Sequence, residues 1–109
     1  MTSALVTDFY ELTMMQGFFL EHHNPRVVFD MFYRNNPFNG GYTIFTGLED
    51  LIEKLENFRF SPEDIQYLRS LNKFQPSFLE YLESYSFSGD LYAFAQGTPA
   101  FPQEPSIRI

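Results

Sequence analysis

The chain has 109 residues, no cysteine and a formal net charge of −7. This length suits one domain with a modest core, and the absence of cysteine excludes disulfides, zinc thiolates and a cysteine nucleophile. The acidic balance argues against nucleic acid as a partner, because phosphate backbones need a basic surface. The apolar runs are too short to span a bilayer and there is no signal-peptide pattern, so we expect a cytoplasmic protein without membrane contact.

Aromatic residues make up 19% of the chain, with fourteen Phe and seven Tyr. That share is about double the roughly 8–10% of average usage. A domain of this size cannot surround so many rings by itself. It therefore packs unusually densely, or some of the rings face a partner.

The first helix is predicted from Asp8 to about Glu21, with Thr7 or Asp8 as its cap. Its apolar residues cover nearly every face: Phe9, Tyr10, Leu12, Met14, Met15, Phe18, Phe19 and Leu20. A helix that is apolar all round is expected to be buried all round. In so short a chain, the second covering surface would be another molecule or a missing domain.

His22-His23-Asn24-Pro25 ends this helix. The simpler interpretation is a polar helix terminus followed by a proline stop. The alternative is a metal-binding pair, but adjacent histidines project in different directions and no third ligand is evident. We therefore expect no metal site here.

Two strands are predicted next, Arg26–Arg34 and Tyr42–Phe45, the second antiparallel to the first. The Asn35–Gly41 loop between them is rich in turn residues and long for a minimal hairpin. Its length indicates a role beyond chain reversal.

Three further amphipathic helices are predicted, each with a recognisable start. Thr46 and Glu49 form a capping-box pattern at the start of the first one. Ser61 caps the second one, and Pro76 lies at the start of the third. The helices are expected to end near residues 57, 71 and 85.

The remaining sequence favours short strands at Leu91–Gln96, Ala100–Phe101 and Ser106–Ile109. The last one is interrupted by the end of the chain without a cap or linker, so we expect a piece of a longer protein. The predicted fold class for residues 1–109 is α+β: a small, mostly antiparallel sheet, the N-terminal helix and three further amphipathic helices.

No phosphate-cradling glycine motif, nucleophile elbow or HExxH motif occurs, so no catalytic residue is expected within the chain. Two groups remain as candidate ligand contacts. Asp8 and Tyr10 are either a helix cap and a core ring, or a carboxylate and a ring that contact a planar ligand. Arg34 is either a solvated or ion-paired strand end, or an anion clamp assisted by the Gly and Asn amides of its loop.

Five short elements, in the same order, resemble nicotinate phosphoribosyltransferases. TDFYELTM at Thr7–Met14 is similar to that family's TDLYELTM, and Phe29–Gly41 is similar to its F-x-x-F-F-R-K-N-P-F-G-G element. The other three are Gly47-Leu48-Glu49, Gly89-Asp90-Leu91-Tyr92 and Gly97-Thr98 with Phe101–Pro105. Each element alone is weak, but their order makes the resemblance specific.

The resemblance implies a transferase that joins nicotinate to phosphoribosyl pyrophosphate in NAD biosynthesis. The products would be nicotinate mononucleotide and pyrophosphate, with coupled ATP hydrolysis and Mg²⁺ in the full-length enzyme. It also implies an N-terminal α+β domain followed by an α/β barrel, which is missing here, so the fragment alone is expected to be inactive and to bind no cofactor. Subunits would form a head-to-tail homodimer in which this domain covers the partner's barrel.

Carried over by position, Tyr10 would stack on the pyridine ring of nicotinate, Asp8 would lie beside it, and Arg34 would contact the phosphates of phosphoribosyl pyrophosphate. Asn35 replaces a basic residue of the family element, and Asn39 lengthens the loop. Two alternatives stay open. One is a nicotinamide-using relative, and the other is a non-catalytic oligomerisation or binding module.

Overall fold

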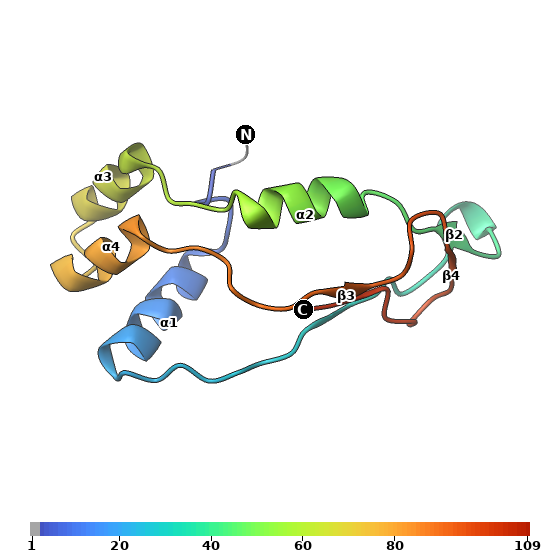
Figure 1. Ribbon diagram of the computed structural model, residues 1–109, viewed down its shortest axis with the longest axis horizontal. Helices are drawn as coiled ribbons and strands as arrows, with labels where there is room; N and C mark the ends of the chain where they lie inside the picture. Colours follow the sequence, from blue (N-terminus) through green and yellow to red (C-terminus); the bar gives the residue numbers. More distant parts are fainter. Residues whose placement is uncertain (1–2) are drawn as a thin grey trace. The chain divides into compact units, whose positions relative to one another are not determined.

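A computed structural model describes residues 3–109, which form two compact units (Figure 1). The first unit comprises the described residues up to Pro25 together with Asn57–Phe87. The second comprises Arg26–Glu56 and Ser88–Ile109. Each unit is therefore assembled from two separate segments of the chain.

The first unit is helical and consists of α1 (Phe9–Leu20), α3 (Pro62–Ser70) and α4 (Pro76–Glu83). Helix α4 packs against both of the others. The side chains that fill this unit come from all three helices and their flanks: Ala4, Leu12, Phe60, Ile65, Leu68, Phe78, Leu79 and Leu82. The spacing of α4 predicts Phe78, Leu79, Leu82 and Tyr81 on its inner face. The first three are buried, whereas Tyr81 is 40% exposed.

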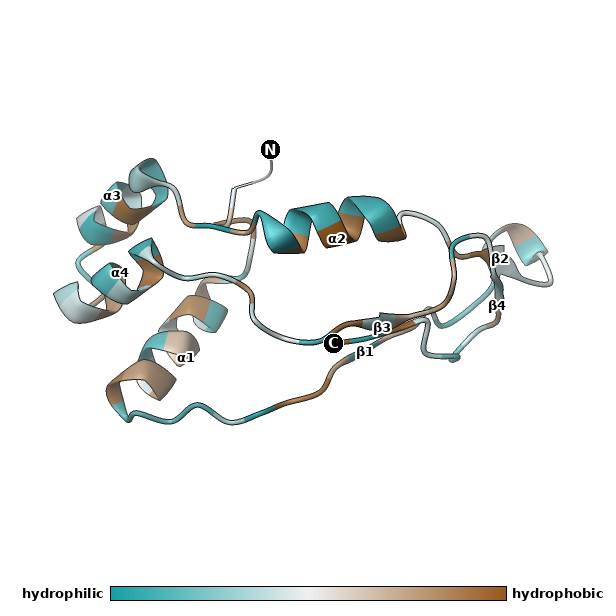
Figure 2. Ribbon diagram, in the orientation of Figure 1, coloured by the Kyte–Doolittle hydropathy of each residue, from teal (hydrophilic) through white to brown (hydrophobic). Residues whose placement is uncertain are grey.

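Within this chain α1 is covered along one side only, so the second covering surface expected for this helix stays a prediction. Only Leu12 of α1 is buried, and Figure 2 shows hydrophobic colour over much of the helix, in contrast to the two-faced α2. Helix α1 meets α4 along one side, where Phe19 stacks on Tyr81 with ring centroids 4.9 Å apart. The exposed apolar side chains of α1, which we call the open face of α1, are Phe9, Tyr10, Met14, Phe18 and Leu20.

The C-terminus of α1 is closed by its own backbone. His23 N donates to Phe18 O at 2.9 Å and His22 N donates to Phe19 O at 3.2 Å. His22 has a left-handed φ of 53°. This is the Schellman arrangement of a helix end, which favours the simpler interpretation of the two histidines.

The start of α3 follows its sequence signals. Ser61 Oγ accepts from Asp64 N, while Asp64 Oδ2 accepts from Ser61 N, at 3.1 and 2.9 Å. Pro62 occupies the first turn, where its missing N–H costs nothing. The predicted cap and boundary of this helix are confirmed to within one residue.

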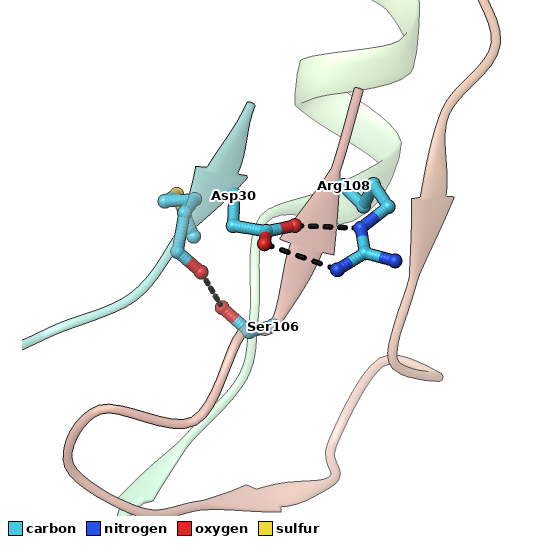
Figure 3. A network of polar contacts seen from close by, with 4 residues as sticks. Asp30, Ser106 and Arg108 are labelled. Carbon is cyan, nitrogen blue, oxygen red and sulfur yellow. Dashed lines mark hydrogen bonds and ion pairs between the residues drawn. The ribbon is translucent and has the colours of Figure 1, made fainter. Parts of the chain in front are cut away.

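The second unit contains a three-stranded antiparallel sheet in the order β1-β5-β3, formed by Asp30–Met31, Ile107–Arg108 and Tyr92–Ala93. The strands are much shorter than predicted, although Phe29 and Ile109 also exchange backbone hydrogen bonds of 3.0 Å. In this sheet Arg108 pairs with Asp30, and Ser106 Oγ donates to Met31 O at 3.3 Å (Figure 3).

The expected pairing of the second strand is wrong. Strand β2 (Thr43–Ile44) pairs with β4 (Pro99–Ala100) in a separate two-stranded sheet, and not with β1. The intervening loop contains a 3₁₀ turn at Pro37–Asn39 with left-handed φ angles at Phe38 and Asn39. This loop is longer than the two-residue turn of a minimal hairpin, and the partner of β1 is β5.

Helix α2 (Leu48–Glu56) starts one residue too late for the predicted Thr46–Glu49 capping box. Its first turn is closed by Leu51 N donating to Gly47 O, which makes Gly47, with a φ of 89°, the capping position. The side chain of Gln96 supplies the acceptor, because its Oε1 lies 3.0 Å from Leu48 N. Across residues 3–109, no helix has the length and apolarity needed to cross a membrane.

Candidate substrate-contact residues

Asp8 lies at the N-cap position of α1 with extended backbone, but its side chain makes no capping hydrogen bond. The hydroxyl of Thr7 instead donates to the carboxylate of Glu11. Asp8 also lines a shallow, open depression together with Leu5, Val6, Thr7 and Glu11. The Asp8 carboxylate therefore lies at the positive N-terminal end of α1, but it does not cap the backbone N–H groups of the helix.

Tyr10 is not a core residue in this chain. Its side chain is 58% exposed, whereas Leu12 is buried. The two residues are about 200° apart around the helix, so they face in nearly opposite directions. The Tyr10 ring is accessible to a planar ligand or to another protein surface.

Arg34 follows Tyr33 at the start of the loop that leads to β2, and its side chain is exposed. Within residues 3–109, Arg34 forms no ion pair with an acidic residue. The guanidinium therefore keeps its hydrogen-bond donors for a ligand or for solvent. Asp8 and Tyr10 belong to the first unit and Arg34 to the second.

The loop amides are less available than the sequence suggests. Gly40 N already donates to Pro37 O at 3.0 Å, so it closes the 3₁₀ turn. A Cβ at Gly40 would lie 3.2 Å from that same carbonyl oxygen, a tight contact that favours glycine at this position. Gly40 is therefore a structural residue of the turn, and its amide is not a donor for phosphate.

Phe38 is a candidate contact residue that sequence analysis did not single out. It is 99% exposed and has a left-handed φ of 56°, an unusual conformation for an aromatic residue. An aromatic side chain next to Pro and Asn in a long loop is the sequence signal that points to it.

Potential metal ligands are not gathered in the part of the chain that the structure describes. No group of three or more His, Cys, Asp or Glu residues in residues 3–109 is placed to hold an ion. The candidate contact residues offer three kinds of group. Arg34 is a planar hydrogen-bond donor, the Asp8 carboxylate is an acceptor, and Tyr10 and Phe38 are exposed rings. Such groups can bind and orient an anion and an aromatic ligand, but they supply no nucleophile.

Comparison with known proteins gives concordant matches. The family model for the nicotinate phosphoribosyltransferase N-terminal domain matches residues 5–109. The chain is 42% identical over 106 residues to nicotinate phosphoribosyltransferase pncB2 of Mycobacterium tuberculosis, covering 97% of this chain and 23% of that protein. It is 41% identical over 113 residues to the Caenorhabditis elegans nicotinate phosphoribosyltransferase, covering 100% of this chain and 20% of that one.

A solved structure shares the fold as well. The crystal structure of human nicotinic acid phosphoribosyltransferase aligns with a TM-score of 0.80 and 31% identity, over 95% of this chain and 22% of that chain. The protein class that these matches define is a phosphoribosyltransferase. More specifically, the chain belongs to the nicotinate phosphoribosyltransferase family and corresponds to its N-terminal domain, which confirms the resemblance seen in the motifs. It spans about a fifth of the length of these relatives.

Proposed function

We propose that this chain is the N-terminal portion of an enzyme that makes nicotinate mononucleotide and pyrophosphate from nicotinate and phosphoribosyl pyrophosphate in NAD biosynthesis. ATP hydrolysis would be coupled to the reaction, which would take place in the cytoplasm. The observation that carries the proposal is the likeness to nicotinate phosphoribosyltransferases over nearly the whole chain. The 109-residue chain by itself would be inactive, because none of its residues is expected to perform the chemistry.

In this proposal the chain's residues position the substrates. Tyr10 stacks on the pyridine ring, an interaction worth about 0.5–1.5 kcal/mol beyond the area it buries. Asp8 lies beside that ring and orders the pocket. Arg34 binds phosphate oxygens through its planar fork, and a charge-assisted contact of this kind is worth about 1.5–3 kcal/mol. These contacts hold the reactants in line and stabilise charge as the ribosyl bond is exchanged.

The open face of α1 supports a protein partner for this unit. Its five apolar residues are between 45% and 58% exposed, and large apolar side chains exposed together on one helix are typical of an interface. We assign this face to the α/β barrel of a second subunit in a head-to-tail homodimer. Nicotinate and phosphoribosyl pyrophosphate would then bind between this domain and the partner's barrel.

Magnesium would accompany the pyrophosphate group. Within residues 3–109 no group of three or more His, Cys, Asp or Glu side chains is placed to hold a metal ion by itself. The ion would be held by substrate phosphates and by residues outside this chain, as is common for Mg²⁺.

A chimeric enzyme tests the proposal directly. Residues 5–109 replace the matching segment of the M. tuberculosis relative, and the product formed from nicotinate and phosphoribosyl pyrophosphate is measured with and without ATP. We expect nicotinate mononucleotide, with a higher rate when ATP is present. The unaltered relative is the positive control, and the 109-residue chain alone is the negative control.

A chimera that folds and dimerises like the unaltered relative, but forms no product, would contradict the proposed function. Nicotinamide offered in place of nicotinate tests the nearest alternative. A chimera that prefers nicotinamide, where the unaltered relative prefers nicotinate, would indicate that this domain belongs to a nicotinamide-using enzyme.

A further inference from the structure

The hydroxyl of Tyr33 joins two parts of the second unit. Its Oη lies 2.7 Å from Ala100 O and 2.9 Å from Asn36 Oδ1, and the side chain is half-buried. A phenol has one hydrogen, so it cannot donate to both oxygens at once. Both contacts are satisfied if the Tyr33 hydroxyl donates to Ala100 O and the side-chain amide of Asn36 is flipped by 180°. The NH₂ group of Asn36 then donates to Tyr33 Oη.

Ala100 connects the two ends of the loop that carries Arg34. It is the register partner of Thr43 in the β2–β4 pair, and it is 3% exposed. Tyr33 therefore attaches the start of the loop, and Thr43 its end, to the same buried residue. The backbone of Tyr33 is held as well, because Gln103 N donates to Tyr33 O at 2.7 Å.

Arg34 is the residue next to Tyr33, and no ion pair within residues 3–109 holds its side chain. Its placement thus depends on the backbone at the base of the loop. We propose that Tyr33 is a positioning residue whose hydroxyl, bound to Ala100 and Asn36, fixes the loop base and so presents Arg34 to the phosphates of phosphoribosyl pyrophosphate. This inference rests on the proposed function.

The test removes only the oxygen, because Tyr33→Phe keeps the ring. In the chimeric enzyme we expect the KM for phosphoribosyl pyrophosphate to rise about 3- to 10-fold, as for the loss of one hydrogen bond. The KM for nicotinate should stay within about twofold of the unsubstituted chimera, because a contact at the loop base acts through Arg34 alone. Tyr67→Phe, which removes an exposed hydroxyl from α3 in the first unit, is the matched control.

A double-mutant cycle shows whether the effect passes through Arg34. In an Arg34→Ala background, Tyr33→Phe should cause no further rise in the KM for phosphoribosyl pyrophosphate. An unchanged KM in the single variant, an equal rise for both substrates, or a fully additive effect in the double variant would each overturn the inference.

Proteolysis of the 109-residue chain tests the loop anchor without any activity. Trypsin should cleave after Arg34 several times faster in Tyr33→Phe than in the unsubstituted chain, while cleavage after Arg69 in the other unit is unchanged. Equal rates after Arg34 would overturn the inference even if the chimera is active. An inactive, folded chimera with faster cleavage after Arg34 in the variant would instead refute the proposed function and leave the loop anchor standing.

Discussion

Asp30 and Arg108 lie directly opposite each other on β1 and β5 and form a two-pronged ion pair (Figure 3). Arg108 Nε donates to Asp30 Oδ1 at 2.8 Å, and Arg108 Nη2 donates to Asp30 Oδ2 at 3.1 Å. The hydrogen bond from Arg108 holds the pKa of Asp30 below its ordinary value of 3.8, against a smaller opposing effect of burial. The pair thus reinforces the register that the short strands set with few backbone hydrogen bonds.

This ion pair predicts a defined pH dependence of local stability. The pKa of Asp30 is lower in the folded state than its ordinary value of 3.8. The stability that the ionised Asp30 contributes is therefore fully present above pH 3.8, and it is lost as the pH falls through the pKa of the folded state. Asp30→Asn should therefore speed hydrogen exchange of the Phe29 and Ile109 amides at neutral pH, and the difference from the unsubstituted chain should vanish in strong acid. The effect should be small and should shrink in high salt, since the pair is near the surface. A difference that grows as the pH falls would contradict this assignment.

Phe78 should be among the most costly residues to truncate in the first unit. It is 0% exposed and contacts the rings of Phe19, Phe74 and Tyr81. Phe78→Ala should lower the free energy of unfolding by about 3–5 kcal/mol, because it removes apolar burial and leaves a cavity. Thermal unfolding followed by circular dichroism measures this. Phe38→Ala, which removes a fully exposed ring of the same size, is the control and should change stability little.

The Ser61 cap should contribute measurably to α3. Ser61→Ala removes the acceptor for Asp64 N and should cost about 1 kcal/mol. Burial opposes the ionisation of Asp64, but hydrogen bonds from Ser61 and from Ser3 keep its pKa below the ordinary value of 3.8. Urea unfolding at neutral pH tests the cap. Ser77→Ala, at an exposed serine of α4, should have less effect, and an equal loss in both variants would mean that the cap is not the cause.

Tyr10→Ala should impair nicotinate use in the chimeric enzyme. Loss of the stacking ring should raise the KM for nicotinate about 2- to 10-fold, with the KM for phosphoribosyl pyrophosphate unchanged. Steady-state kinetics with each substrate varied in turn measures this. Tyr10→Phe keeps the stacking ring and should behave like the unsubstituted chimera. Unchanged nicotinate kinetics in Tyr10→Ala would remove Tyr10 from the proposed site.

Arg34→Ala should impair the use of phosphoribosyl pyrophosphate. Loss of the charge-assisted contact should raise its KM about 10- to 100-fold, and Arg34→Lys should recover only part of the loss because it lacks the planar fork. Mixed dimers test where the residue acts. Arg34→Ala subunits combined with subunits whose barrel is inactive should regain activity, because one site then has an intact domain on an intact barrel. No recovery in mixed dimers that have formed would exclude a site shared between subunits.

Local sequence signals determined the features of this protein that depend on neighbouring residues. The Ser61-Pro62-Glu63-Asp64 start of α3, the inward spacing of Phe78, Leu79 and Leu82, and the end of α1 at the two histidines all follow from short-range chemistry. The ordered motifs likewise identified the family, and the α+β class was predicted correctly.

Only the tertiary structure decided which distant segments meet. Three contacts join residues that lie 48 to 67 positions apart in the sequence. They are the pairing of β2 with β4, the hydrogen bond from Leu48 N to the Gln96 side chain, and the hydrogen bond from Tyr33 to Ala100 O. No local propensity encodes such contacts, because they depend on how the whole chain folds. The exposure of Tyr10 was also decided by packing, since α1 packs against α4 along one side and the apolar residues of the open face of α1 stay exposed.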